Sequence, residues 1–295
     1  MKVISQYVTN MSQPEDNVGQ WLERIGRVCY KSEEQITEDS WKDFIKMIIK
    51  RQHYSVLEHV NWALLVDKFV IDSIHDNPFV NCKVLNNHWI ITSNFRVLLE
   101  NKDKSYIWNF LFHMVQDYLS FKVVNEPFPK ILEHITAIPI FLEDVPDDFK
   151  IETFKLVTDR GVTHEHVRHR RCAHSQESTR YCNYSKAKFN KEITVIDPMF
   201  NYDNVKERHK WYVWHDQCKS AEKAYFKLLD IGMTPQEARS VLPNSLKTEI
   251  ITTMTLEMWK HWLKLRTAVG AHPQMRDIAK KVEIVLKKKY SKYFK

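Results

Sequence analysis

Apolar residues recur three and four positions apart in several stretches of the chain, the spacing that gives a helix one buried face. Such stripes run over residues 41–49, 107–118 and 211–228. Ser32 lies three positions before a glutamine, which predicts a capping box ahead of the first stripe. Gly232 follows the third stripe and predicts where that helix ends. The pattern therefore predicts three amphipathic helices.

A fourth, shorter helix is predicted from Thr234 to Pro243. Thr234 is a favourable N-cap, Pro235 occupies the first helical position and Glu237 completes a reciprocal capping box. Strands are predicted where β-branched and apolar residues alternate or cluster. These stretches are residues 2–8, 61–71, 152–159, 192–197 and 247–255.

The predicted helices and strands are mixed along the chain without strict alternation, which favours an α+β fold over a doubly wound sheet. No internal repeat occurs, and with five Gly and ten Pro the chain has no obvious flexible linker. We therefore expect a single domain over residues 1–295, built on a mixed or antiparallel sheet with flanking helices. Two proline-containing stretches, 125–130 and 143–150, are expected to be surface excursions.

The composition excludes several classes of protein. A chain of 295 residues with 43% hydrophobic residues buries a sizeable core, so disorder, a collagen-like repeat and a small disulfide scaffold are excluded. The five cysteines are an odd number without a Cys-x-x-Cys pair, which indicates reduced thiols in the cytoplasm. No apolar run reaches the roughly 20 residues that a bilayer requires, so we expect a soluble, unprocessed protein.

The charge favours an anionic partner. Lys and Arg number 44 against 37 Asp and Glu, which gives a formal net charge of +7 and a pI near 9.0. This balance alone does not distinguish nucleic acid from nucleotides or acidic metabolites. Neither glycine-rich phosphate loop occurs in the chain, whether GxGxxG or GxxxxGK followed by Ser or Thr.

Residues 163–185 concentrate the candidate chemistry, with four arginines and four histidines. The plainest interpretation is a solvated basic face. A zinc site is disfavoured, because Arg168 stands where the HExxH pattern requires its second histidine and the nearby arginines repel a cation. Nucleic-acid binding would use Arg for phosphates and His and Tyr for stacking, but no named module matches.

The third interpretation is a site for a small anion. If residues 166–171 are helical, Glu165, Arg168 and His169 share one face, because positions three and four apart are neighbours. Gln176 and Ser178 then add amide and hydroxyl groups that read the edges of a base, while Arg forks bind phosphate. This combination suits a nucleotide.

The order and spacing of these residues resemble a known family, the flavin-dependent thymidylate synthases. The family's defining motif is RHR, seven residues, then S-x-R-Y, and the positions that resemble it are Arg168, His169, Arg170, Ser178, Arg180 and Tyr181. Further positions that are similar to family segments are His53, Ser55, Glu58, His59, Ser93, Asn94, Arg96, Arg239 and Arg266. The resemblance spans residues 20–280.

The resemblance implies that the protein methylates dUMP at C5 to give dTMP. In this family the carbon comes from 5,10-methylenetetrahydrofolate, FAD reduced by NADPH supplies the hydride, tetrahydrofolate is released and no cysteine nucleophile is used. The family also implies a homotetramer with shared active sites. It explains the positive charge without a nucleic-acid or membrane partner, because dUMP, FAD, NADPH and folate are all anionic.

Residue roles are implied position by position. Arg266 matches the residue that contacts the uracil and is expected to be catalytic. The implied dUMP-binding residues are Glu165, Arg168, Gln176, Glu177, Ser178, Thr179, Arg180, Arg239 and Arg266. The implied FAD-binding residues are Ser55, Arg168, His169, Arg170, Gln176 and His261. No metal ligand is implied.

Two of these segments also have plain structural interpretations. His53 and His59 are alternatively core histidines with satisfied hydrogen bonds. Arg239 is alternatively the partner of Glu237 or Glu249 in a surface ion pair, although such pairs contribute little to stability.

One segment departs from the family pattern. Where the family commonly has Asn-Leu-Arg, this chain has Thr255, Leu256 and Glu257. A glutamate in place of an arginine reverses a charge beside a cofactor that becomes anionic on reduction, which weakens flavin binding unless another cation compensates. The alternative functions are a related flavoenzyme that transfers another one-carbon unit, such as hydroxymethyl, and a basic nucleic-acid-binding protein without enzyme activity.

Overall fold

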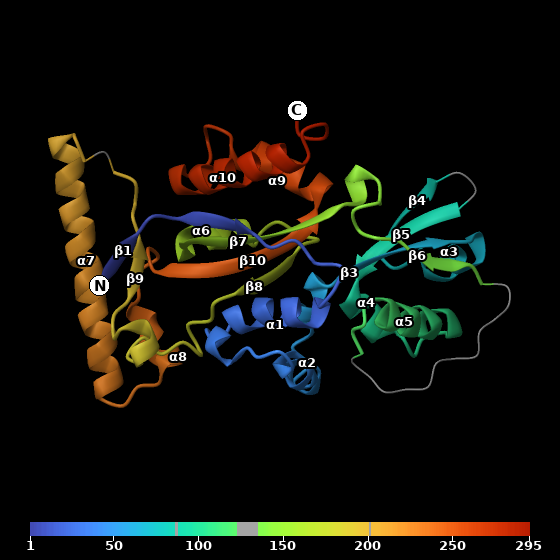
Figure 1. Cartoon of the computed structure of the whole chain (residues 1–295). Coiled ribbons are helices and arrows are strands. Elements are labelled where there is room, and N and C mark those ends of the chain that lie inside the picture. The colour runs from blue at the N-terminus through green and yellow to red at the C-terminus, as the bar shows by residue number, and fades with distance from the viewer. Residues whose placement is uncertain (86–87, 123–134, 201) are drawn as a thin grey trace.

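The strands of the chain form three sheets in the computed structural model, which describes residues 1–85, 88–122, 135–200 and 202–295 (Figure 1). The prediction of an α+β fold is confirmed. The strands are divided among several sheets rather than gathered in one. The reason is that residues 2–8 break into two strands that join different sheets, and residues 61–139 build a sheet of their own.

The central sheet is antiparallel, with strand order β2-β7-β10-β8. Its strands are β2 (Tyr7–Asn10), β7 (Ile151–Asp159), β8 (Ala173–Gln176) and β10 (Lys247–Thr255). The strands predicted over 152–159 and 247–255 are confirmed. β10 pairs with β7 from Lys247 opposite Asp159 to Thr255 opposite Ile151, and with β8 on its other side. Its run of β-branched Ile and Thr suits a strand that is buried on both faces.

The side sheet is also antiparallel, with strand order β4-β5-β3-β6. Its strands are β3 (Asn61–Val66), β4 (Asn81–Leu85), β5 (His88–Asn94) and β6 (Ala137–Pro139). The strand predicted over 61–71 is wrong in its second half. The helix α3 (Lys68–Ile74) begins there because the Asp67 carboxylate accepts a hydrogen bond from the Val70 amide and caps it.

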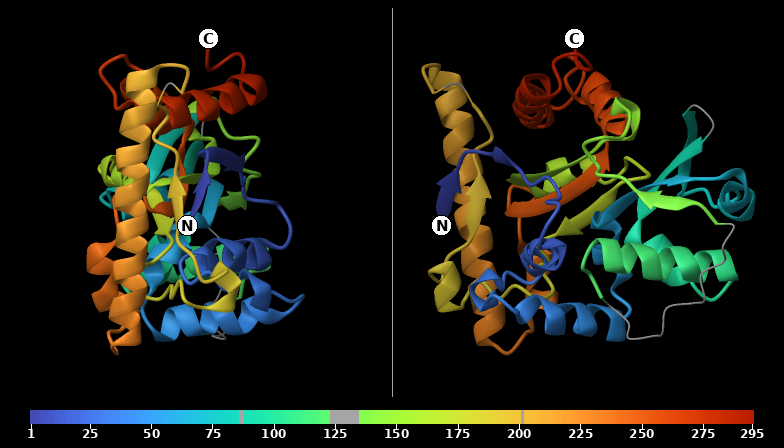
Figure 2. Two further views of the ribbon diagram at one scale, coloured as in Figure 1. Left: turned by 90° about the vertical axis from the view of Figure 1, so that its left-hand side faces the viewer. Right: turned by 45° about the vertical axis from the view of Figure 1, so that its right-hand side comes forward.

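A two-stranded parallel sheet pairs residues 2–4 with residues 194–196. It consists of β1 (Lys2–Ile4) and β9 (Thr194–Ile196), so the strand predicted over 192–197 is confirmed. The long helix α7 (Val205–Asp230) runs along this two-stranded sheet at the edge of the molecule (Figure 2). Tyr225 and Cys218 of α7 are buried in one cluster with Val195 of β9.

The remaining helices are α1 (Val18–Val28), α2 (Ser40–Lys50), α4 (Phe95–Asn101), α5 (Tyr106–Tyr118), α6 (Arg160–His166), α8 (Pro235–Ala238), α9 (Leu256–Arg266) and α10 (Pro273–Lys289). The three predicted apolar stripes are confirmed as α2, α5 and α7. Gly232 ends α7 with a φ of 98°, a left-handed conformation that glycine adopts freely.

The two predicted capping boxes have different outcomes. Thr234 and Glu237 form theirs at the start of α8, but that helix ends at Ala238 and a 3-10 turn continues to Val241, before the predicted end. The box predicted at Ser32 is wrong, because the Ser32 hydroxyl accepts a hydrogen bond from the Arg27 side chain instead. Residues after it form a 3-10 turn, and α2 begins later, at Ser40.

The central sheet is covered on both faces (Figures 1 and 2). α6, α9 and α10 pack on one face, and α1 with the 3-10 turn Tyr54–His59 packs on the other. Alternation along β10 explains this, since neighbouring residues of a strand point to opposite faces. Ile250 and Met254 join the cluster of α9 and α10, whereas Ile251 joins the cluster of α1.

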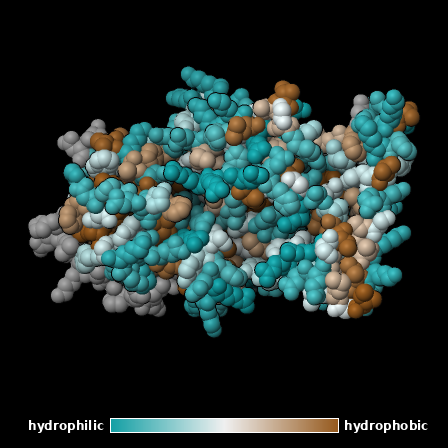
Figure 3. All heavy atoms as spheres, turned by 180° about the vertical axis from the view of Figure 1, so that it is seen from behind, coloured by the Kyte–Doolittle hydropathy of each residue, from teal (hydrophilic) through white to brown (hydrophobic). Residues whose placement is uncertain are grey.

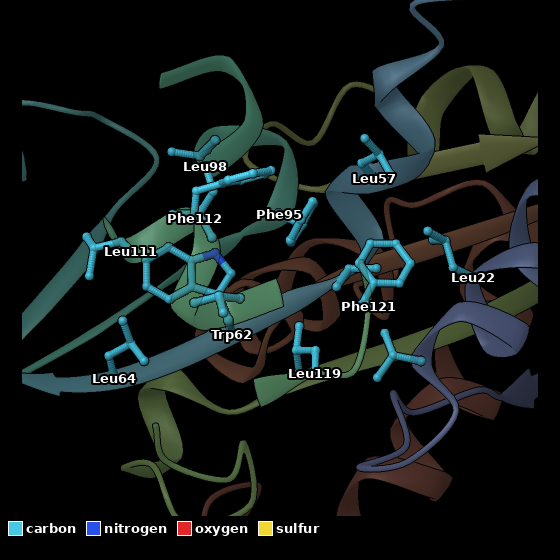
Figure 4. Packing of buried hydrophobic residues seen from close by; sticks show 14 of the residues in the cluster. Leu22, Leu57, Trp62, Leu64, Phe95, Leu98, Leu111, Phe112, Leu119 and Phe121 are labelled. Carbon is cyan, nitrogen blue, oxygen red and sulfur yellow. The ribbon is translucent and has the colours of Figure 1, made fainter. Parts of the chain in front are cut away.

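The cluster of α1 extends into the side sheet (Figure 4). Phe95 of α4 lies 5.1 Å from Phe121, centroid to centroid, and Leu57 belongs to the same cluster. Trp62 of β3 continues the cluster towards α5. The side sheet therefore shares its core with the central part, although the expectation of one domain over the whole chain stays a prediction.

Residues 143–150 lie at the surface as predicted, with Glu143, Asp144 and Asp147 exposed, but two of their side chains anchor the segment. Val145 and Phe149 are buried, and they pack with Ala63 of β3. The other predicted excursion, 125–130, lies outside the described residues. All five cysteines are unpaired thiols. In the described ranges no helix has the length and apolar character needed to cross a bilayer.

Gly26 allows α1 to approach α2 closely. A Cβ atom at this position would lie 2.5 Å from Phe44 Cζ and 3.1 Å from Val56 Cγ1. We expect Gly26→Ala to lower the free energy of unfolding by about 1–3 kcal/mol, because overpacking outweighs the gain in helix propensity. Urea unfolding measures this change. Gly270→Ala is the control, since its Cβ meets nothing within 4 Å; equal stability of the two variants would contradict the close packing.

Candidate functional site

Two adjacent threonines of β10 gather buried imidazoles from both faces of the central sheet. Thr252 Oγ1 lies 2.7 Å from His166 Nε2 and 2.9 Å from His174 Nδ1. On the opposite face, Thr253 Oγ1 lies 2.7 Å from His59 Nδ1. A hydroxyl carries a single proton, so at most one of the two rings on Thr252 accepts a hydrogen bond and at least one donates. These bonds fix α6, β8 and the turn that precedes β3 to one strand.

Burial favours the uncharged form of these rings. Desolvation lowers the pKa of His59 to about 3 and holds the pKa of His166 well below its ordinary value, and His174 adds repulsion to both. Burial lowers the pKa of His174 as well. His59 uses its second nitrogen too, because Nε2 lies 3.0 Å from Ser175 Oγ. His59 therefore has the hydrogen bonds of a core histidine and positions the motif segment without facing solvent.

The arginine-rich motif follows α6 and does not lie on it. α6 begins at Arg160, where the Asp159 carboxylate accepts a hydrogen bond from the Val162 amide at 2.7 Å, and it ends at His166. The helix that the sequence analysis considered over 166–171 therefore does not form. Thr252 holds His166 against the sheet, and Arg171 has a φ of 60°, a left-handed conformation that a right-handed helix does not contain.

Arg266, at the end of α9, is anchored at three points to the segment that carries the motif. Its Nη1 donates to Glu165 Oε2 at 2.9 Å, and its Nη2 donates to the Glu165 carbonyl oxygen at 3.0 Å. Its Nε donates to His169 Nε2 at 3.0 Å. Three of the five guanidinium N–H groups are engaged in this way, which leaves two for a ligand.

The contact with Arg266 defines the state of His169. Because its Nε2 accepts a hydrogen bond, the neutral ring carries its proton on Nδ1. Burial and the positive charge of Arg266 lower the pKa of His169 to about 4. The His261 ring lies 6.2 Å away, centroid to centroid. Arg168 and Arg170 are exposed, and within the described part of the chain their guanidinium groups make no hydrogen bond or ion pair.

A second group of candidate residues lies at the other end of β8. Arg239 Nη1 donates to Thr179 Oγ1 at 3.3 Å, and Arg180 is exposed and stacks over its neighbouring tyrosine ring. The alternative in which Arg239 pairs with Glu237 or Glu249 is wrong, because the Glu237 carboxylate caps α8 and Glu249 binds lysines. No hydrogen bond among the described residues joins this group directly to the Arg266 group.

Glu177 is buried in a charge network that the sequence analysis missed. Lys247 Nζ lies 2.9 Å from Glu177 Oε2 and 2.7 Å from Glu249 Oε1, and Lys31 Nζ lies 3.0 Å from the same Glu249 atom. Although burial opposes it, the two lysines lower the pKa of Glu249 to about 2. The signal in the sequence was the alternation of Lys247 and Glu249, which places both on one face of the strand.

The other predicted residues occupy separate positions. Gln176 Nε2 donates to Thr163 and Thr248 between the two groups. Ser178 Oγ accepts the Arg180 amide and contacts no base among the described residues, so nothing there activates it as a nucleophile. Ser55 is exposed on the turn before β3.

The departure at Thr255 and Glu257 has a local cause. Thr255 Oγ1 accepts a hydrogen bond from the Met258 amide and caps α9. Glu257 is exposed in the first helical turn, where a negative charge is favourable to the helix dipole. Both residues therefore stabilise the beginning of α9, independently of any role in ligand binding.

A cavity of about 270 Å³, here called the junction cavity, lies between the end of β10 and the side sheet. The central part contributes Glu58, Arg171 and Thr255 to its lining, and the side-sheet part contributes Phe79, Thr92 and Arg96. Glu58 and Arg96 form an ion pair of 2.5 Å across it. Within the described ranges no cluster of three or more His, Cys, Asp or Glu side chains is arranged to hold a metal ion.

Comparisons with known proteins identify a family. A family model described as thymidylate synthase complementing protein matches residues 10–76 and 150–290. The chain is 30% identical over 169 residues to the flavin-dependent thymidylate synthase of Pyrococcus abyssi, covering 55% of this chain and 64% of that one. It is 33% identical over 171 residues to the enzyme of the same name from Pyrococcus horikoshii, covering 57% and 62%. The chain thus spans less than two thirds of the length of these curated relatives.

The buried histidines predict a stability that falls as the solution becomes acidic. The pKa of His59 is about 3 in the folded protein, whereas the pKa of a histidine in the unfolded chain is about 6.5. Unfolding therefore binds protons between these values, and each such ring lowers the free energy of unfolding by about 1.4 kcal/mol per pH unit as the pH falls. Urea unfolding at a series of pH values gives this slope.

The matched variant is His59→Gln, which retains one donor and one acceptor but does not titrate. We expect its free energy of unfolding to depend on pH less steeply than that of the wild type, by about 1.4 kcal/mol per pH unit below pH 6.5. The slope is independent of any overall loss of stability. An unchanged slope would show that His59 is protonated in the folded protein.

Proposed function

The chain belongs to the family of thymidylate synthase complementing proteins, and we propose that it is a flavin-dependent thymidylate synthase that methylates dUMP at C5 to give dTMP. The proposed carbon donor is 5,10-methylenetetrahydrofolate, the proposed reductant is NADPH, and tetrahydrofolate is the second product. The observation that carries this proposal is the fixed Arg266 side chain, held against Glu165 and His169 with two N–H groups to spare.

The donor set at the motif fits a flavin dinucleotide. Arg168 and Arg170 are unpaired cations, and His169 keeps a free Nδ1–H beside them. These three side chains, with His261 across from His169, are the ones that would hold FAD. The two other proposed flavin contacts are Gln176 at the end of β8 and Ser55 on the turn before β3. FAD reduced by NADPH would supply the hydride for the reaction.

Arg266 is the proposed catalytic residue. A planar guanidinium that is held at Nε and at both terminal nitrogens does not rotate, so its two unused N–H groups keep one direction. Directed at the uracil N3 and its neighbouring carbonyl, they would stabilise negative charge on the ring. That charge raises the electron density at C5, the atom that must attack the methylene carbon.

Nucleotide binding is proposed for the second group. Arg180 and Arg239 offer guanidinium forks for the phosphate, and the Ser178 and Thr179 hydroxyls directly precede Arg180 in sequence. Glu177 is proposed to act through its bonds with Lys247 and Tyr184, since its buried carboxylate is engaged there. Arg168 and Glu165 would approach the same nucleotide from the Arg266 side.

We propose a homotetramer in which separate copies complete each site. The Arg266 group and the Arg239 group flank opposite ends of β8, whose four residues alone span about 10 Å. α7 also leaves apolar side chains exposed, including Val205, Tyr212 and Val213. Hydrophobic residues also reach the surface along the right-hand edge of the molecule in Figure 3. Such a surface is suited to contact with another copy. The proposed compartment is the cytoplasm, which the five unpaired thiols support.

The experiment that tests the function combines FAD, NADPH, dUMP and methylenetetrahydrofolate with the purified protein and identifies the product by mass. We expect dTMP from the wild type. Arg266→Ala is expected to lose turnover by a factor of about 100 or more while it still binds FAD, because the flavin contacts lie on other side chains. Wild-type turnover in this variant would contradict the catalytic role.

The same assay separates the alternatives. A product heavier than dTMP by one oxygen would identify a hydroxymethyl transfer. A protein that binds no flavin but binds long polyanions with a steep salt dependence, without competition from dUMP, would be a nucleic-acid-binding protein.

Shared sites predict that two inactive variants restore each other. We expect Arg266→Ala and Arg239→Ala to be inactive alone, and their coexpressed mixture to recover about one quarter of wild-type activity, because random assembly leaves some sites with both arginines. A mixture of Arg266→Ala with itself is the control. No recovery in the coexpressed mixture would show that one copy supplies the whole site.

A further inference from the structure

Glu177 stands directly before the turn 178–181, which carries most of the second group of candidate residues, and it is held by its backbone and by its side chain. Its amide donates to the Glu249 carbonyl oxygen at 2.8 Å. Its carboxylate accepts hydrogen bonds from Lys247 Nζ at 2.9 Å and from the Tyr184 hydroxyl at 3.3 Å. The residue is only 2% exposed. The place where the turn begins is therefore set by contacts that Glu177 makes inside the protein.

The residues after α1 hold the same turn from a distant part of the chain. The Ser178 amide donates to the Cys29 carbonyl oxygen at 3.0 Å. Two residues further on, Lys31 Nζ lies 3.0 Å from Glu249 Oε1, the atom that Lys247 Nζ approaches to 2.7 Å. Lys31 has a φ of 49°, a left-handed conformation that persists only where the surrounding contacts hold it. Main-chain and ionic contacts thus join the end of α1 to the segment that begins at Glu177.

Both lysines carry their charge into a largely buried place. The side chain of Lys247 is 16% exposed and that of Lys31 is 17% exposed. Although burial opposes it, the carboxylates beside them raise the pKa of both amines, so both are charged at neutral pH. A buried ion pair adds little net stability, because desolvation offsets the attraction, but removal of one partner leaves an uncompensated charge. The Glu177 carboxylate therefore keeps its buried position because Lys247 compensates its charge.

We infer that Lys247 and Lys31 are positioning residues for the nucleotide. Lys247 fixes Glu177, and Lys31 fixes Glu249 together with the residues after α1. Residues 178–180 are thereby held in the arrangement in which they bind the phosphate. Lys247 acts through Glu177 and not on the nucleotide itself. This inference rests on the proposed function, in which residues 178–180 belong to the dUMP site.

The first test removes one charge. Lys247→Met keeps a side chain of similar length but leaves the Glu177 carboxylate without a counter-charge, so that the carboxylate turns towards solvent and displaces residues 178–180. We expect the KM for dUMP to rise by about 10- to 100-fold, while kcat at saturating dUMP changes by less than about threefold. The dissociation constant of FAD should stay the same, because the flavin contacts are proposed beside Arg266. Formation of dTMP at a series of dUMP concentrations gives both kinetic constants.

A second substitution separates positioning from direct contact with the phosphate. Glu177→Gln, added to Lys247→Met, removes the uncompensated charge and keeps an acceptor for the Tyr184 hydroxyl. We expect the double variant to have a KM for dUMP at least about fivefold lower than that of Lys247→Met alone, since the two side chains act as a pair. If Lys247 instead bound the phosphate itself, the added substitution would recover nothing, and that result would overturn the inference.

Lys289→Met is the matched control. Its Nζ lies 2.5 Å from Glu152 Oε1, and the Glu152 side chain is 1% exposed, like that of Glu177. Glu152 stands near the beginning of β7, whereas Lys247 pairs with Asp159 at the end of that strand. The control therefore removes an equally buried ion pair far from residues 178–180, and its KM for dUMP should equal that of the wild type. A KM raised as much as in Lys247→Met would mean general destabilisation and would overturn the positioning role.

Lys31 is tested without strain in its turn. Lys31→Gly removes the amine at a position whose left-handed φ glycine adopts freely, so a loss of dUMP affinity reports the missing charge. We expect the KM for dUMP to rise by about 3- to 10-fold, less than in Lys247→Met, because Lys247 still pairs with Glu249. An unchanged KM would overturn the role of Lys31.

The outcomes also separate this inference from the proposed function. If the wild type forms dTMP and Lys247→Met has the same KM for dUMP, the inference is overturned while the proposed function stands. If the wild type neither forms dTMP nor binds dUMP, the proposed function fails, and hydrogen exchange of the peptide that contains residues 177–184 decides the positioning alone. Faster exchange in Lys247→Met than in Lys289→Met, slowed again by Glu177→Gln, supports it. Equal exchange in all variants overturns it.

Discussion

The central strand of this protein depends on histidines that must stay uncharged. Thr252 and Thr253 offer two hydroxyl groups, and three imidazoles from three different segments converge on them inside the sheet. Among the described residues these rings bond to hydroxyl groups and to no carboxylate, so a proton on any ring would place an uncompensated charge there and would break the donor and acceptor order along the hydroxyls. The motif turn, β8 and the turn before β3 hold their positions because this order is intact. The same threonines thus set the geometry of elements that are far apart in sequence.

From this arrangement the candidate site follows by short connections. His166 is the last residue of α6, so its bond to Thr252 determines where the next residues turn, and His169 arrives beside Arg266 as a result. Arg266 belongs to α9, which starts at a threonine cap directly after β10. β10 therefore positions both sides of the Arg266 contact. The His169 side is held through the bond between His166 and Thr252, and Arg266 is held because α9 follows β10 directly in the chain. A functional side chain that is held by a helix and a strand in this way is positioned more precisely than one on a loop.

Much of this was predictable from local sequence, and the failures have physical causes. The stripes of α2, α5 and α7 and the β-branched run of β10 carry their periodicity in neighbouring residues. The motif residues were identified in the sequence by their fixed spacing, and their roles stay predictions. The sequence analysis missed the helix after Asp67, because one capping carboxylate interrupts an apolar run. It also missed the turn at His166, because Thr252, 86 residues away along the chain, determines that turn. Lys247 and Lys31 were missed for the same reason, since their partners lie across the fold.

The way the side sheet is attached bears on how this lineage could have acquired it. β3 leaves the central part of the molecule, and β6 returns beside it, with Leu64 opposite Pro139. Because the two ends of this segment lie side by side, a change in its length moves the rest of the chain little. The entropic cost of closing such a loop also grows only slowly with its length. Segments joined in this manner can be gained, lengthened or exchanged during evolution while β7 stays in place. The family model matches the regions on either side of residues 77–149, which is compatible with such a history.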